Sequence, residues 1–176
     1  GESKLNRVGD AWRHVKFMLL YSPSWLYFAP GAALLLVGLI GILALATGPV
    51  TLLGRTWQIH TLFACIAAIL IGLQITQLGI FARTFAAVQL GEQDAALDRL
   101  RRLIRLEHGL LLGGVIFLAG LVIVGSIGIS WALDGFGALG HEYLTAIGFT
   151  MLGVGVQLVL GSFFLGLLTM RPSVHS

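Results

Sequence analysis

Side chains able to do chemistry are few in this sequence, and three of them are amides inside otherwise apolar stretches. Gln74 and Gln77 lie one helical turn apart, and Gln157 stands midway between Gly153 and Gly161, four residues from each. If these stretches cross a membrane, each amide needs a protein partner, because lipid offers none. We therefore expect Gln74, Gln77 and Gln157 to join neighbouring helices, with lipid or substrate binding as the alternative.

The histidines are the other candidate ligands, and they lie at the ends of apolar stretches or in the tails. They are His14, His60, His108, His141 and His175. His60 and His141 are expected on the same side of a membrane and could hold a haem between them. A polar residue at a membrane boundary is expected without any ligand, so we favour that simpler role. The His141-Glu142 pair lacks the second histidine of a zinc-protease motif.

Composition places these side chains in a membrane protein. The chain has 176 residues, of which 57% are hydrophobic and 11% charged, and its mean hydropathy is +0.92. Several uncharged stretches are long enough to cross a hydrocarbon core of ~30 Å at ~1.5 Å per residue. They cover roughly residues 25–46, 61–82, 110–133 and 144–169. We predict an all-α membrane protein whose transmembrane helices, four in number, form two hairpins.

The polar segments between these stretches have a helical pattern of their own. The opening segment places apolar side chains on one stripe, with Lys16 near its edge, where the ammonium could reach lipid phosphates. The segment between the second and third spans has a basic face formed by Arg101, Arg102 and Arg105. The simpler interpretation of that face is a solvated loop helix, and the functional one is a surface for anionic lipid. The predicted division is a juxtamembrane segment (1–23), hairpin 1 (24–83), a cytosolic interfacial helix (84–109) and hairpin 2 (110–176).

Basic residues indicate the orientation of the chain. Almost all lie before the first span, between the second and third, or after the fourth, whereas Arg55 lies on the opposite side. By the positive-inside rule, both termini are expected in the cytoplasm, with the spans in the inner membrane. The net charge of +3 then reflects attraction to an anionic leaflet, and we expect no nucleic acid partner.

A weak internal repeat links the two hairpins. The matched positions, at the same spacing, are Gly72, Gln74 and Phe81 in the first and Gly155, Gln157 and Phe164 in the second. A basic amphipathic segment precedes each hairpin. Two parallel hairpins are the natural description. Because apolar helices share composition by chance, a true duplication stays open at this point.

The opening residues resemble a known junction. They read Gly1-Glu2-Ser3-Lys4-Leu5, then Trp12-Arg13-His14, then Phe17-Met18-Leu19-Leu20-Tyr21-Ser22-Pro23. This pattern resembles the junction between catalytic and membrane domains in family 2 glycosyltransferases of the dolichol-phosphate mannose synthase type. The resemblance covers about the first 30 residues in detail. It implies a cytosolic nucleotide-sugar-binding domain of GT-A fold, with an Asp-rich metal motif, that transfers a sugar onto a polyprenyl phosphate.

The same resemblance implies a place for the lipid phosphate. It puts Ser3 and Lys4 beside the acceptor, with Arg7 or Arg13 as a second basic contact. Hydroxyl and cationic donors on an interfacial helix suit a phosphate at the bilayer surface. The alternative is a plain basic anchor.

The sequence lacks the motifs expected of the catalytic domain of such an enzyme. The sequence has no paired aspartates and no glycine-rich phosphate loop, and its eight acidic residues are scattered through connections. We therefore expect no catalytic residue, cofactor or metal site in this chain. A divalent metal, Mg or Mn, is expected in a catalytic domain upstream of Gly1, and the sequence is expected to be a fragment of a longer protein.

We predict that the chain anchors a glycosyltransferase and positions its lipid acceptor, while a sugar moves from a nucleotide-sugar to polyprenyl phosphate on the cytosolic face. The expected partners are membrane lipid, polyprenyl phosphate and the upstream catalytic domain, and homo-oligomerisation is left open. The alternative is a stand-alone four-span lipid transporter, a flippase-like subunit or a scaffold. The lack of charge within the spans argues against an ion-coupled pump but not against a lipid flippase.

Overall fold

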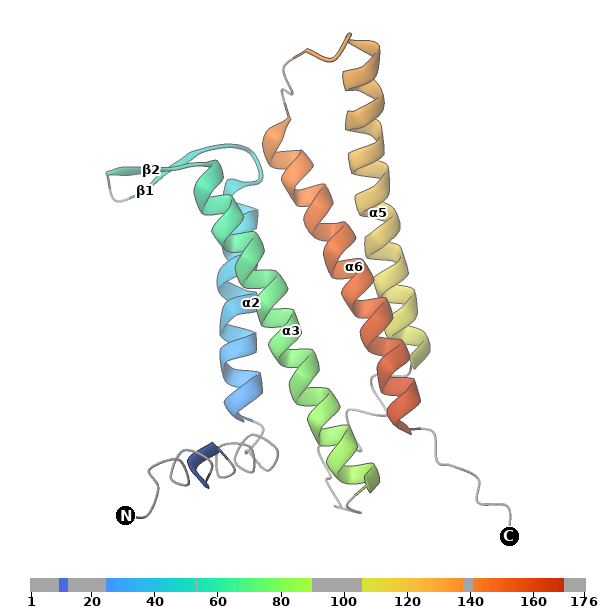
Figure 1. The fold of residues 1–176 in the computed structure, drawn as a ribbon. Helices are drawn as coiled ribbons and strands as arrows, with labels where there is room; N and C mark the ends of the chain where they lie inside the picture. The colour runs from blue at the N-terminus through green and yellow to red at the C-terminus, as the bar shows by residue number, and fades with distance from the viewer. Residues whose placement is uncertain (1–9, 13–24, 53, 90–105, 138–140, 170–176) are drawn as a thin grey trace, which may run out of the picture.

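The computed structural model describes residues 10–12, 25–52, 54–89, 106–137 and 141–169 (Figure 1). Its elements are α2 (Trp25–Leu45), β1 (Val50–Leu52), β2 (Arg55–Trp57), α3 (Ile59–Gln89), α5 (Leu106–Leu133) and α6 (Glu142–Thr169). Within the described residues, these four helices are long and apolar enough to cross a membrane. The prediction of an all-α membrane protein with four spanning helices is confirmed. Of the predicted juxtamembrane segment only residues 10–12 are described, and they are helical; of the predicted interfacial helix 84–109, residues 84–89 belong to α3 and 106–109 to α5, and the rest lies outside the described residues.

The helices form two antiparallel hairpins, α2 with α3 and α5 with α6, which meet along α3 and α6 (Figure 1). We call the end where α2 and α5 begin and α3 and α6 finish the proximal end. The distal end carries the two hairpin connections. Apolar side chains cover the outside of the bundle, with Leu43 67% and Val122 68% exposed. Such a surface suits lipid, in which each helix satisfies its own backbone hydrogen bonds.

Two helices extend beyond the predicted spans at the proximal end. α3 continues past Arg83 to Gln89, and α5 begins at Leu106, before His108. The sequence argument ended each span near the first polar side chain, but a helix can continue beyond the membrane boundary. The Arg83 guanidinium lies 5.9 Å from the centre of the Phe28 ring, a cation–π contact that helps to hold it at this position.

A small β-hairpin joins α2 to α3, where only a short connection was expected. β1 and β2 pair antiparallel, with Val50 opposite Trp57. Gly54 lies in the turn with a φ of +73°, a conformation that glycine adopts without steric cost. The hairpin extends sideways at the distal end and places Arg55 there, exposed (Figure 1).

Glycines allow the two helices of each hairpin to approach closely. A methyl group built on Gly72 of α3 would lie 2.8 Å from the carbonyl oxygen of Gly31 on α2. A methyl group on Gly155 of α6 would likewise lie 2.8 Å from the carbonyl oxygen of Gly113 on α5. Small residues at such crossings let backbones come together, which is how helices associate in lipid.

Equivalent contacts in the two hairpins are related by constant differences in residue number. Adding 82 to Gly31 gives Gly113, and adding 83 to Gly72 gives Gly155. The same two offsets relate a second crossing in each hairpin. In the first, Gly38 faces the carbonyl oxygen of Cys65 and the amide nitrogen of Ile69, and in the second, Gly120 faces those of Gly148 and Leu152. The internal repeat hypothesised from the sequence therefore extends to the backbone contacts.

At one layer the repeat keeps the contact but exchanges the small residue between helices. In the first hairpin, Gly41 of α2 lies against the Cys65 sulfur of α3. At the equivalent place in the second hairpin, Gly148 of α6 is the glycine and Ile123 of α5 is the larger side chain. Only one of two facing residues needs to be small for the helices to stay close.

Two adjacent glycines provide a test of this packing. A methyl group on Gly113 would lie 2.9 Å from the carbonyl oxygen of Gly155, whereas one on Gly114 would meet nothing within 4 Å. Gly113→Ala should therefore lower the free energy of unfolding by about 1–3 kcal/mol, the usual cost of overpacking. Gly114→Ala, the matched control, should change it by less than about 0.5 kcal/mol. Denaturation in mixed detergent micelles measures both, and equal effects would contradict the close crossing.

Candidate functional site

The glutamine side chains of the transmembrane helices lie between α3 and α6. The amide of Gln157 donates through Nε2 to Oε1 of Gln74, at 3.3 Å. Gln77 donates through Nε2 to the main-chain oxygen of Gln157, at 2.9 Å. The structure thus brings the three predicted amides together across one helix interface. We call Gln74, Gln77 and Gln157 the amide seam.

An approximate two-fold axis runs along this interface. Gln74 and Gln157 are equivalent in the repeat, and they contact each other. Phe81 and Phe164 are also equivalent, and their ring centroids lie 4.8 Å apart at 68°. Equivalent residues meet in this way when a two-fold axis passes between them. Because α3 and α6 run in the same direction, the axis lies along the bundle, as in parallel membrane repeats (Figure 1).

Two buried side-chain oxygens in the described part of the chain have no hydrogen bond. They are Oε1 of Gln157, in the seam, and Oγ1 of Thr84, whose side chain is only 1% exposed. Other helical hydroxyls here donate to the carbonyl four residues back, as Thr150 does to Ala146. An unpaired buried oxygen costs free energy, so these two positions are not optimised for packing alone.

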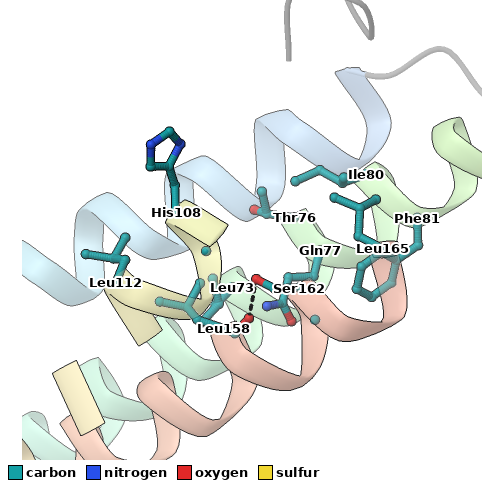
Figure 2. A pocket seen from close by; sticks show the side chains of 12 residues that line it. Leu73, Thr76, Gln77, Ile80, Phe81, His108, Leu112, Leu158, Ser162 and Leu165 are labelled. Carbon is teal, nitrogen blue, oxygen red and sulfur yellow. Dashed lines mark hydrogen bonds between the residues drawn. The ribbon is translucent and has the colours of Figure 1, made fainter. Parts of the chain in front are cut away.

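A groove of about 310 Å³ opens near the seam, between α3, α5 and α6 (Figure 2). Its walls are mostly apolar, with leucines such as Leu73, Leu112 and Leu158. Four polar residues also line it, namely Thr76, Gln77, His108 and Ser162. The lining belongs to the proximal half of the membrane, because His108 is the third residue of α5. We call this the proximal groove.

The groove's polar side chains differ in how they are satisfied. Thr76 donates to the carbonyl of Gly72 and Ser162 to that of Leu158, both at 2.8 Å. Both hydroxyl oxygens lie at helix crossings, that of Thr76 against Gly31 of α2 and that of Ser162 against Gly109 of α5. His108 is exposed and makes no hydrogen bond within the part of the chain that the structure describes. Figure 2 shows its ring at the margin of the groove, with Gln77 and Ser162 toward the interior.

The predicted phosphate and anionic-lipid contacts cannot be located here. Ser3, Lys4, Arg7, Arg13, Lys16, Arg101, Arg102 and Arg105 lie outside the described residues. His60 and His141, considered as haem ligands, are both exposed at the distal end. Among the described residues, no group of three or more His, Cys, Asp or Glu side chains could hold a metal ion.

The sequence argument missed three groove residues, Thr76, His108 and Ser162, as parts of one site. Hydroxyls and a helix-start histidine carry little signal in an apolar helix, because each has an ordinary structural role.

These features define the chain as a multi-pass α-helical membrane domain built on an internal repeat. Residues 80–169 match the family described as the glycosyltransferase family 2 C-terminal transmembrane region. The chain belongs to this family, and it is the membrane domain of a family 2-type glycosyltransferase. The prediction of a family 2 glycosyltransferase membrane domain is thereby confirmed.

One curated relative is similar along most of the chain. The chain is 34% identical over 166 residues to the low-salt glycan biosynthesis hexosyltransferase Agl6 of Haloferax volcanii. The similarity covers 94% of this chain but only 40% of that protein, so the chain spans about two fifths of its relative's length. No solved structure matches the chain. The family match favours the glycosyltransferase over a four-span transporter or scaffold.

The amide seam can be tested by a double-mutant cycle on Gln74→Leu and Gln157→Leu. The side-chain bond between them should give a coupling of about 0.6–1.7 kcal/mol in the free energy of unfolding, the range of hydrogen bonds between membrane helices. The control cycle pairs Gln77→Leu with Gln157→Leu. It should be additive, because Gln77 bonds the main chain of Gln157. Additivity in both cycles would contradict a stabilising hydrogen bond between Gln74 and Gln157.

Proposed function

We propose that this chain anchors a hexosyltransferase and holds its acceptor, polyprenyl phosphate, while the sugar is transferred from a nucleotide-sugar at the cytosolic face. Membership in the glycosyltransferase family 2 transmembrane region carries the proposal. A relative named as a hexosyltransferase supports the type of sugar. The domain's task is to fix the acceptor relative to the bilayer and the catalytic domain.

The choice of acceptor is supported by the opening residues. Ser3 and Lys4 belong to the junction pattern, and the juxtamembrane segment that begins with them leads into α2, whose first residue lies at the proximal end. A lipid phosphate there would receive a hydroxyl and a charge-assisted hydrogen bond, with Arg7 or Arg13 as the second cation. Lys16, Arg101, Arg102 and Arg105 would hold surrounding anionic lipid.

The reaction itself is assigned to the upstream catalytic domain, the proposed partner of this chain. The divalent metal, Mg²⁺ or Mn²⁺, is assigned to that domain as well, because the resembled enzymes carry their Asp-rich metal motif there. Metal bound there would neutralise the leaving nucleotide phosphates. The chain described here contributes orientation and an apolar path for the lipid.

The first test is Lys4→Ala in the full-length enzyme. Loss of a charge-assisted hydrogen bond should raise the KM for polyprenyl phosphate about tenfold, whereas the KM for the nucleotide-sugar should stay unchanged. Arg55→Ala, which removes a cation at the distal end, is the matched control and should alter neither. An unchanged acceptor KM in Lys4→Ala would remove this lysine from the phosphate site.

The orientation is tested by cysteine labelling. Thr56 on β2 and Glu107 on α5 are both exposed, at the distal and proximal ends respectively. The native Cys65 is buried within a span and should give little background. An impermeant maleimide should label Thr56→Cys in intact cells and Glu107→Cys only after the membrane is opened. The reverse pattern would place the proximal end outside.

A further inference from the structure

The polar lining of the proximal groove breaks the internal repeat. The glycines of the two backbone crossings and the Gln74–Gln157 pair keep their character between hairpins. The four polar residues of the groove do not. At the same offsets, Thr76, Gln77, His108 and Ser162 correspond to Val159, Leu160, Leu26 and Gly79.

The counterparts of the groove residues indicate whether helix packing requires polar side chains there. The four counterparts of the groove's polar residues are all apolar, and they make similar contacts within their hairpins. Helix packing by itself therefore does not require polar side chains at these positions. Gly79 against Tyr27, for example, takes the place of Ser162 against Gly109. Polar groups at membrane depth are expensive and commonly functional. Buried polar residues elsewhere also break the repeat, as Thr150 does opposite Ala67, so what distinguishes the groove is that Gln77 and His108 lie together in an otherwise apolar lining.

The depth of the groove limits what can enter it. α5 has 28 residues, which at ~1.5 Å each exceeds the ~30 Å hydrocarbon core, so its first turn lies at headgroup level. His108 is in that turn. On α3 and α6, Leu73 and Leu158 are the lining residues furthest from the proximal end. The groove thus runs from the headgroup level down into the hydrocarbon, past Gln77 and Ser162.

An occupant at this depth must be lipid, with a polar group near His108 and an apolar segment below. The volume of about 310 Å³ is small and suits a short length of one chain. A diacyl phospholipid brings two chains together at its glycerol, whereas a polyprenyl phosphate has a single chain directly below its phosphate. The single groove, bounded by three helices, fits the second kind of lipid.

We propose that the proximal groove holds the first part of the isoprenoid chain of the acceptor, with His108 at the phosphate end. This inference rests on the proposed function, since it takes polyprenyl phosphate as the acceptor. Gln77 and Ser162 line the groove beside the segment next to the phosphate. The leucines pack against the isoprene units beyond it.

The experiment uses the full-length enzyme in vesicles and a polyprenyl phosphate that carries a diazirine on its first isoprene unit. Labelled peptides are mapped by mass spectrometry, and transfer of sugar to unmodified polyprenyl phosphate is measured in parallel. We expect labelling on α5 and α6 around residues 108–112 and around Ser162, the part of the lining next to the phosphate end. A diazirine phosphatidylglycerol in matched vesicles should label this region much less.

Two pairs of variants test the groove. Ile80→Trp fills it, and its control, Phe163→Trp, places the same side chain at the equivalent position outside it. Ile80→Trp should reduce groove labelling about fivefold or more, with little change in the control. Gln77→Leu installs the side chain of its counterpart Leu160 and should weaken labelling about threefold, while Leu160→Gln should not. Circular dichroism verifies that each variant is folded.

Each alternative result has a distinct meaning. Equal losses in both members of each pair would overturn the groove assignment. Labelling elsewhere in the chain, with sugar transfer intact, would overturn the assignment of the isoprenoid chain to the groove but would leave the proposed function standing. Equal labelling of the groove by phosphatidylglycerol would make it a general lipid site and also overturn the inference. Polyprenyl phosphate that neither binds nor accepts sugar would overturn the proposed function itself.

Discussion

Close contact between helix backbones is the constraint on which the rest of this structure depends. In lipid, burying one apolar side chain against another gains little, because the bilayer is already apolar. The helices therefore associate where glycine removes the side chain, as at Gly72 against Gly31 and Gly155 against Gly113. These crossings fix the height and rotation of each helix in its hairpin. The positions of every other side chain in the interior follow from them.

The two hairpins then join through equivalent surfaces. An approximate two-fold axis between α3 and α6 brings Gln74 to Gln157 and Phe81 to Phe164. An amide in lipid lacks any other partner, so this pairing satisfies polar groups that each hairpin would otherwise leave exposed. Gln77 adds a bond to the main chain that has no equivalent in the second hairpin, since residue 160 is leucine. The asymmetry begins at this residue and continues into the proximal groove.

In this glycosyltransferase membrane domain, the glycine crossings repeat between the hairpins and form a symmetric frame, whereas the proximal groove is asymmetric. A rigid frame keeps its shape in a fluid bilayer because its crossings are backbone contacts, not adaptable side-chain contacts. The polar residues of the groove come from both hairpins, Thr76 and Gln77 from the first and His108 and Ser162 from the second, and they leave the glycine crossings intact. Val159 and Leu160, the counterparts of Thr76 and Gln77, illustrate that the frame accepts apolar side chains at these positions.

The sequence by itself determined the membrane class, the four spans, the helical hairpins and the family, because hydrophobic length and a junction motif are local signals. It also indicated the repeat through Gly72, Gln74 and Phe81 and their partners. It underestimated the lengths of α3 and α5, since polarity marks the membrane boundary and not the helix end. The β-hairpin, the offsets of the crossings and the meeting of Thr76, Gln77, His108 and Ser162 were decided by tertiary structure alone. These residues come from three helices, and only the glycine crossings set which of their faces converge.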